Sequence, residues 1–185
     1  MQKSVFVKFA SLAVAGVLSQ GAFAADGTIN FTGEITTQIC SVSPNSQNLI
    51  VPLGKVSRAA FDGGTAGTAA VGKKATPAKF TIDLLGCDTT TLKNATVTFT
   101  GAADTDATLL RLANAGQVGV TAASGVAIEL GDSAGTKIPL GSPSSAYILG
   151  QGDNSLKFQA VYVATKTAVT AGPANSVAQF TMDYK

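Results

Sequence analysis

The sequence has 185 residues, a formal net charge of +2 and no histidine. Two of its 13 basic residues, Lys3 and Lys8, lie in an N-terminal leader, and without them the eleven remaining basic residues balance 11 acidic ones. A neutral chain lacks the basic surface that nucleic acids and acidic membranes require, and the lack of histidine removes the commonest general base and zinc ligand. We therefore expect no nucleic-acid partner, no metal, no cofactor and no catalytic site.

Residues 1–24 have the pattern of a secretory signal peptide. A basic start precedes an apolar run over residues 9–18, and Ala22-Phe23-Ala24 offers a small–x–small cleavage site. The apolar run is too short to span a bilayer, and no later stretch approaches that length. We predict export, cleavage after Ala24, and a mature chain without an integral membrane segment.

Residues 28–36 alternate polar and apolar positions directly after the predicted leader. Ile29, Phe31, Gly33 and Ile35 share one face, while polar residues share the other. This period of two is typical of a strand with one buried face. At a chain end, such a strand can fold back onto its own domain or add to the open sheet of a neighbour, and the rest of the sequence favours the second outcome.

Cys40 and Cys87 are the only cysteines. In an exported protein we expect them to form a disulfide, with a free reactive pair as the minor alternative. The bridge would close a loop of about 48 residues, which in the chain-entropy model contributes on the order of 4 kcal/mol.

Short strand-like runs separated by turn residues fill the rest of the chain. Alternating apolar positions predict strands within residues 80–87, 95–99, 126–130 and 156–164. Residues 49–54 also read as a strand, and Pro52 places this strand at a sheet edge. Loops are expected over residues 62–76 and 102–108. Because helical patterns are almost absent, we predict an all-β, antiparallel sandwich of immunoglobulin-like type, with a jelly roll as the open alternative.

A last alternating run reaches the end of the sequence. Ala178, Phe180, Met182 and Tyr184 share one face, and Lys185 follows. We expect the outer edge of this strand to lack a partner. An uncovered apolar edge is an aggregation hazard that monomeric proteins usually avoid.

Several features occur in one order along the mature chain: the first strand with Gly33, then Cys40, Gly86-Cys87, residues 156–162, and Gly172-Pro173-Ala174 before Phe180–Lys185. Together they resemble fimbrial subunits of the chaperone–usher class, specifically the major pilin of type 1-like fimbriae. The resemblance implies a donor-strand extension over residues 25–37 and an immunoglobulin-like pilin domain over residues 38–185 that lacks its final strand.

The resemblance also implies how such a domain is completed. A periplasmic chaperone would supply the missing strand first, and the extension of the next subunit would replace it after delivery to an outer-membrane usher. Ile29, Phe31 and Ile35 would fill an acceptor groove, with Gly33 where the groove is shallow. The acceptor edge, which the chaperone also binds, would consist of Ala178, Phe180, Met182, Tyr184 and the terminal carboxylate of Lys185. Head-to-tail contacts of this kind generate a filament, here a homopolymer in an extracellular fimbrium that supports adhesion.

Two other function classes stay open. A secreted carbohydrate-binding adhesin module could use the same sandwich, although the chain has room for one domain only and carries a donor segment. An enzyme has less support, because no nucleophile–base pair can be assembled. Residues 67–73 read G-x-x-x-x-G-K, but Lys74 stands where a magnesium ligand should follow and the run precedes a strand, so we expect a surface loop. The sequence leaves open whether the subunit belongs to the shaft, an adaptor or a terminator; neutral charge slightly favours the shaft.

Overall fold

A computed structural model describes residues 29–30, 32–33, 35, 38–113 and 121–185. The chain divides into two compact units, Met1–Ile35 and Thr36–Lys185. The predicted signal peptide, residues 1–24, lies outside the described residues, as does Phe31. The second unit, which we call the pilin-like domain, carries every strand in the described part of the chain.

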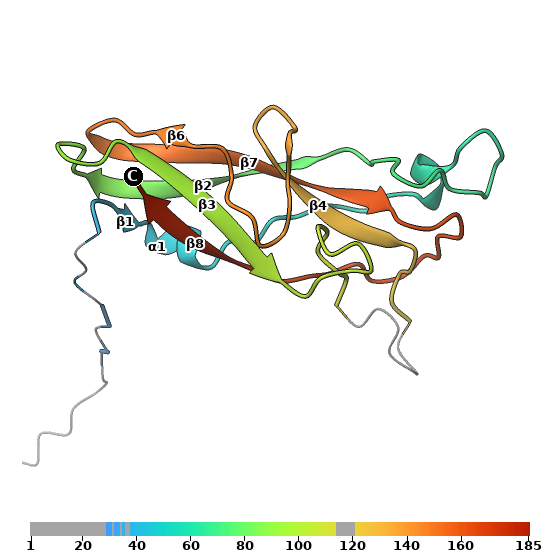
Figure 1. Ribbon diagram of the computed structural model, residues 1–185. Helices are drawn as coiled ribbons and strands as arrows, with labels where there is room; N and C mark the ends of the chain where they lie inside the picture. Colours follow the sequence, from blue (N-terminus) through green and yellow to red (C-terminus); the bar gives the residue numbers. More distant parts are fainter. Residues whose placement is uncertain (1–28, 31, 34, 36–37, 114–120) are drawn as a thin grey trace, which may run out of the picture. The chain divides into compact units, whose positions relative to one another are not determined.

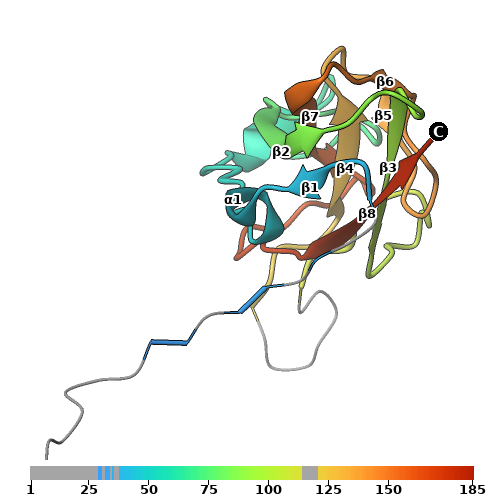
Figure 2. The ribbon, with the colours of Figure 1, turned by 90° about the vertical axis from the view of Figure 1, so that its left-hand side faces the viewer.

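The pilin-like domain is built from two antiparallel sheets (Figures 1 and 2). One has five strands in the order β1-β2-β7-β4-β5, and the other has three in the order β6-β3-β8. The elements are β1 (Ser41–Val42), α1 (Pro44–Gln47), the 3₁₀ helix η1 (Arg58–Phe61), β2 (Ala78–Cys87), β3 (Asn94–Gly101), β4 (Val126–Asp132), β5 (Lys137–Ile138), β6 (Tyr147–Ile148), β7 (Gly152–Ala164) and β8 (Ala178–Tyr184). The all-β prediction is confirmed.

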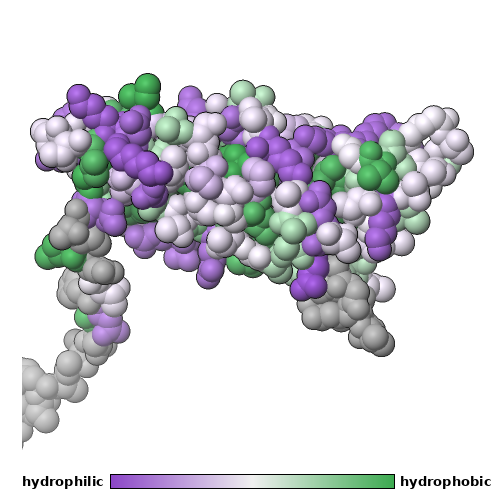
Figure 3. Space-filling model, viewed as in Figure 1, coloured by the Kyte–Doolittle hydropathy of each residue, from purple (hydrophilic) through white to green (hydrophobic). Residues whose placement is uncertain are grey.

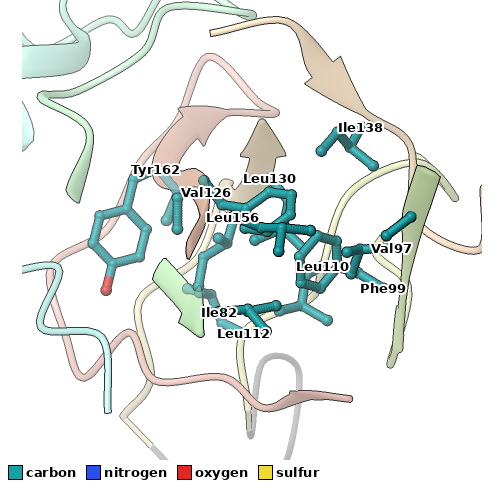
Figure 4. Packing of buried hydrophobic residues seen from close by; sticks show 14 of the residues in the cluster. Ile82, Val97, Phe99, Leu110, Leu112, Val126, Leu130, Ile138, Leu156 and Tyr162 are labelled. Carbon is teal, nitrogen blue, oxygen red and sulfur yellow. The ribbon is translucent and has the colours of Figure 1, made fainter. Parts of the chain in front are cut away.

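The core lies between the sheets and consists mostly of the predicted alternating positions (Figure 4). Ile82 of β2, Val97 of β3 and Leu156 of β7 are at most 1% exposed. Phe158 lies among aromatic rings, with its centroid 5.2 Å from that of Phe99 in an edge-on contact. Full burial of a large apolar side chain contributes about 1.5–3 kcal/mol, so these inward faces account for much of the stability.

Strand β4 departs from the predicted alternation, because both of its faces are covered. Ala127 is fully buried with Leu109 and Val163 in a small second cluster outside the main core. Glu129 is also buried, and its carboxylate accepts a hydrogen bond at 2.6 Å from Lys74. The backbone of residues 72–75 pairs with the end of β7, and Leu110 pairs with Ile128 of β4. The side chains of Lys74 and Leu109 thereby cover part of the outer face of this sheet.

The predicted edge strand over residues 49–54 is wrong. The structure gives these residues no strand pairing. Pro52 has no N–H to donate to a ladder, and Gly54 has a φ of +73°, which lies in the left-handed region and interrupts an extended run. The segment instead leads into η1, where the Ser57 hydroxyl accepts a hydrogen bond from the N–H of Ala59 at 3.3 Å.

The predicted disulfide is confirmed. Cys40 and Cys87 are bonded to each other, and both are buried. The bond ties the start of the pilin-like domain to the end of β2, next to the pairing of Ser41 with Leu85. It therefore fixes where residues preceding Cys40 leave this domain.

The described residues include no helix of sufficient length and apolar character to traverse a bilayer.

Candidate functional site

The first half of the candidate site is the predicted donor segment in the Met1–Ile35 unit. Ile29 is 78% exposed and Ile35 is 101% exposed. A Cβ added at Gly33 would meet nothing within 4 Å. Large apolar side chains left in water favour a binding partner that covers them. Phe31, the remaining predicted apolar position, lies outside the described residues.

The second half is β8, at the edge of the three-stranded sheet. It pairs with β3 along its whole length, from Ala178 opposite Gly101 to Tyr184 opposite Ala95. In the described part of the chain, no strand pairs with its other side. Roughly half of the backbone N–H and C=O groups of such a strand point away from its neighbour and are free to accept another strand.

The side chains of β8 are covered less than those of the strand beside it. Phe180, Met182 and Tyr184 pack against the main core but are only half-buried, while the residues between them are exposed. Their cross-strand partners on β3 are at most 4% exposed. The core is therefore closed under β3 and incompletely closed under β8.

The segment around and after β1 has the same half-covered character. Val42, Leu53 and Val56 are partly buried and pack against the same core. Figures 1 and 2 both show β1 beside β8, although the two strands belong to different sheets and do not pair. We call the half-buried side chains of β8, together with Val42 of the neighbouring β1, the open seam. A strand lying along it could pair with β8 and cover apolar side chains from both sheets.

The end of the chain is held in the sheet by backbone hydrogen bonds. The main-chain oxygen of Lys185 accepts hydrogen bonds from the backbone N–H groups of Lys93 at 3.1 Å and Asn94 at 2.8 Å. The Lys185 N–H donates a hydrogen bond to the backbone carbonyl of Asn94 at 2.9 Å. The Lys185 ammonium also lies 3.2 Å from the carboxylate of Asp183, but both side chains are exposed. Exposed ion pairs contribute about 0–1 kcal/mol, so the backbone ladder fixes the terminus.

Tyr162 holds the segment that leads into β8. Its hydroxyl donates a 2.7 Å hydrogen bond to the carbonyl of Ala174, and burial raises its pKa. Burial likewise raises the pKa of Tyr184. Close by, a Cβ on Gly172 would come within 2.6 Å of the Ala123 backbone nitrogen, so only glycine allows this approach. The sequence predicted a strand over residues 156–164 but did not indicate this contact of Tyr162.

The structure assembles the predicted acceptor edge on one strand. Ala178, Phe180, Met182, Tyr184 and Lys185 follow one another along β8 and its end. The positions that sequence reasoning missed are Val42, Leu53 and Val56. Val42 lies in the two-residue strand β1, which is too short to show a period, Leu53 lies in the wrongly predicted strand over residues 49–54, and Val56 lies in an irregular segment.

The G-x-x-x-x-G-K run does not have the geometry of a phosphate-binding loop. Ala69 forms a bridge with Asp62, and Lys74 forms one with Val163. The Lys73 ammonium donates to the backbone carbonyl of Asp62. The run is followed by β2 rather than by a helix, and its last residues pair with the backbone at the end of β7.

Comparisons with known proteins agree with this arrangement. The family model described as "Fimbrial protein" matches residues 29–185. A probable major fimbrial subunit, LpfA, of Escherichia coli O157:H7 is 37% identical, with 100% of this chain and 98% of the relative covered. Long polar fimbria protein A of Salmonella typhimurium is 38% identical over the same shares of the two chains. The fold matches a chain in a chaperone-usher pilus structure with a TM-score of 0.68 and 25% identity, covering 92% of this chain and 100% of that one.

Proposed function

The chain belongs to the fimbrial protein family and is a structural subunit of an extracellular fimbria with an immunoglobulin-like fold; from this premise we propose that it polymerises head to tail by donor-strand complementation. In this proposal residues 25–37 are the donor extension and residues 38–185 form the acceptor domain. The observation that carries it is the half-covered strand β8. Within the part of the chain that the structure describes, it has a free edge and an apolar face that its own domain leaves partly open.

The donor segment has the chemistry that the open seam requires. Ile29 and Ile35 present apolar side chains to solvent, and Phe31 shares their alternation in the sequence. Gly33 would lie where the seam leaves no room for a side chain. Each large side chain that becomes fully buried contributes about 1.5–3 kcal/mol, and the backbone ladder along β8 adds hydrogen bonds. Three such residues in series support a slowly dissociating polymer.

Before assembly, the same edge needs a temporary cover. A periplasmic chaperone that adds its own strand to β8 would protect the open seam and hold the subunit until an outer-membrane usher presents the next donor segment. Ala178, Phe180, Met182, Tyr184 and the carboxylate of Lys185 form the chaperone-binding edge in this proposal. The full-length likeness to a probable major fimbrial subunit supports a place in the shaft.

The proposal is tested by deleting residues 25–36 and looking for extracellular polymer by electron microscopy and gel electrophoresis without heating. Donor-strand complementation predicts that the deleted chain is exported but adds to no filament, whereas the intact chain runs as a ladder that heat dissociates. A matched control replaces Thr32, on the polar face of the segment, with Ser and leaves the ladder unchanged. Normal filaments from the deleted chain would refute the proposal.

A further inference from the structure

Charged residues gather with opposite sign at the two ends of the pilin-like domain. The first end, which we call the basic end, comprises η1, residues 62–74 and the turn after β7, and it carries Arg58, Lys73, Lys74 and Lys166 against Asp62 and Glu129. The second, the acidic end, lies where β2 ends and β7 begins, and it carries Asp88, Asp153, Asp183 and the terminal carboxylate against Lys93 and the Lys185 ammonium. Figure 3 shows hydrophilic residues spread along the visible face of the domain, both ends included.

The two ends are too far apart to act on each other within one copy. Strand β7 runs from Gly152 at the acidic end to Ala164 at the basic end, and 13 residues of strand span roughly 40 Å. The Debye length at 0.1 M salt is about 10 Å. The two charged ends therefore do not attract each other within one domain, but each can attract an oppositely charged end of a second copy.

Most of these charges are also available. Among the ion pairs in the described part of the chain, none involves Arg58, Lys73 or Lys166, and none involves Asp88 or Asp153. All five side chains are exposed. The pKa of Asp88 is lowered because the Thr90 N–H donates to its carboxylate, so the charge is present at neutral pH.

The path of the donor segment decides which ends meet. The extension joins the pilin-like domain beside Cys40, which is bonded to Cys87 at the acidic end. Strand β8 runs toward that end, since Tyr184 lies opposite Ala95 near the start of β3. The strand pairs within this domain are antiparallel. A donor strand that is likewise antiparallel to β8 runs toward the basic end of the acceptor copy and emerges there. The next residues of the donating copy lead to its own Cys40, so the acidic end of the donating copy lies next to the basic end of the acceptor copy.

We propose that the basic end of one copy binds the acidic end of the next copy along the filament, as a second contact beside the inserted strand. This inference rests on the proposed donor-strand function. Insertion of the donor strand parallel to β8 would bring two acidic ends together, and their like charges would repel each other. The charge contact therefore also favours antiparallel insertion. Complementary charge of this kind accelerates encounter and suppresses wrong orientations.

The test reverses the charge at one end at a time in the mature chain. One variant carries Lys73→Glu with Lys166→Glu, and the other carries Asp88→Lys with Asp153→Lys. Polymerisation of each purified variant is followed by light scattering at low and high salt. We expect each variant alone to assemble about tenfold more slowly than the unmodified chain at low salt, with the difference largely lost at high salt because the charges are screened.

An equimolar mixture of the two variants gives the decisive result. Each reversed end then faces an end of opposite charge on the other variant, so we expect the mixture to regain the unmodified rate as an alternating copolymer. Misfolding cannot explain such recovery, because mixing two misfolded variants would not restore the assembly of either one. Unmodified rates for the separate variants, or a mixture no faster than its components, would overturn the inference.

A matched control separates the contact from net charge. Lys79→Glu with Lys157→Glu makes the same charge change on exposed residues of β2 and β7 between the two ends. We expect this control to assemble at the unmodified rate and to give no recovery when mixed with the Asp88→Lys, Asp153→Lys variant. Equal slowing by the control would contradict the inference. Failure here leaves donor-strand assembly intact, whereas polymer formed without residues 25–36 would remove the proposed function itself.

Discussion

Strands β7 and β8 have the same sequence pattern and different surroundings. Leu156, Phe158 and Ala160 of β7 are at most 5% exposed, because β2 and β4 flank the strand and the second sheet covers its inner face. Phe180 and Met182 of β8 alternate in the same way but are only half-buried, and among the described strands only β3 pairs with β8. The pattern specifies a strand with one apolar face, while neighbouring elements decide whether that face is covered.

This difference divides the molecule into a completed part and an incomplete part. Around β7 the domain supplies all the contacts that its side chains need. Along β8 it leaves the apolar side chains half-buried. The exposed apolar side chains of the Met1–Ile35 unit are of the kind that could cover them in another copy. The stability cost of a substitution near β7 should therefore be similar in the unassembled chain and in the filament, whereas the cost of one in β8 should be larger in the filament.

The largest expected effect comes from the disulfide that closes the completed part. Replacing both Cys40 and Cys87 with Ser should lower the free energy of unfolding by about 4 kcal/mol, because the unfolded chain regains the entropy of the open loop. Urea unfolding of the unassembled mature chain measures the change. Adding reductant to the unmodified chain should reproduce it, and an unchanged midpoint in both samples would contradict the prediction.

A matched pair of core substitutions probes the comparison itself. Leu156→Ala in β7 should destabilise the domain by about 2–5 kcal/mol through loss of buried methyl groups, both in the unassembled chain and in the filament. Met182→Ala in β8 should cost clearly less in the unassembled chain, where its side chain is half-buried, and more in the filament. Thermal unfolding of the two forms gives both values, and equal costs for Met182→Ala in the two forms would remove the distinction.

A substitution in the donor segment should weaken assembly without changing the domain. Ile35→Asp places a charge where the open seam is apolar and removes about 1.5–3 kcal/mol of side-chain burial, so the filament should dissociate at lower temperature or denaturant. The unassembled domain should unfold as before, because Ile35 is fully exposed. A filament as resistant as the unmodified one would show that this residue is not inserted.

The smallest effect concerns the tyrosine that holds the approach to β8. Tyr162→Phe removes the hydrogen bond to Ala174 and should cost about 0.5–1.5 kcal/mol. The pKa of Tyr162 is raised in the folded state. Its stabilising effect is therefore complete below the pKa of an unfolded tyrosine, about 10, and is lost as the pH rises through the folded value. Stability measured from pH 9 to 12 should fall less steeply in the variant, and parallel curves would contradict this role.

The sequence predicted the long elements and the disulfide, and the reasons for its failures are physical. Strands β2, β3, β7 and β8 are long enough for an apolar period of two to be visible. Strands β1, β5 and β6 have two residues each, which is too short for any period, and they arise from pairing with distant partners. Residues 49–54 were predicted as a strand from their apolar content, but Pro52 and Gly54 prevent regular pairing.

The candidate site was predictable on one side only. The alternation from Ala178 to Tyr184 predicted a strand with an unpaired outer side, and in the described part of the chain β8 has one. That this side is the acceptor edge stays a prediction. Its other side, at Val42, depends on how the two-residue strand β1 lies against segments distant in the sequence. The cover over β4 was hidden for the same reason, since contacts between Leu109, Ala127 and Val163 join segments distant in the sequence.

Amide hydrogen exchange in the filament and in the unassembled mature chain tests the central claim most directly. The domain is incomplete along β8 in this account, so amides of β7 should be protected in both forms, while amides on the outer side of β8 should exchange quickly in the unassembled chain and slowly in the filament. A stable monomer whose β8 amides are already as protected as those of β7, and remain unchanged on assembly, would contradict the account.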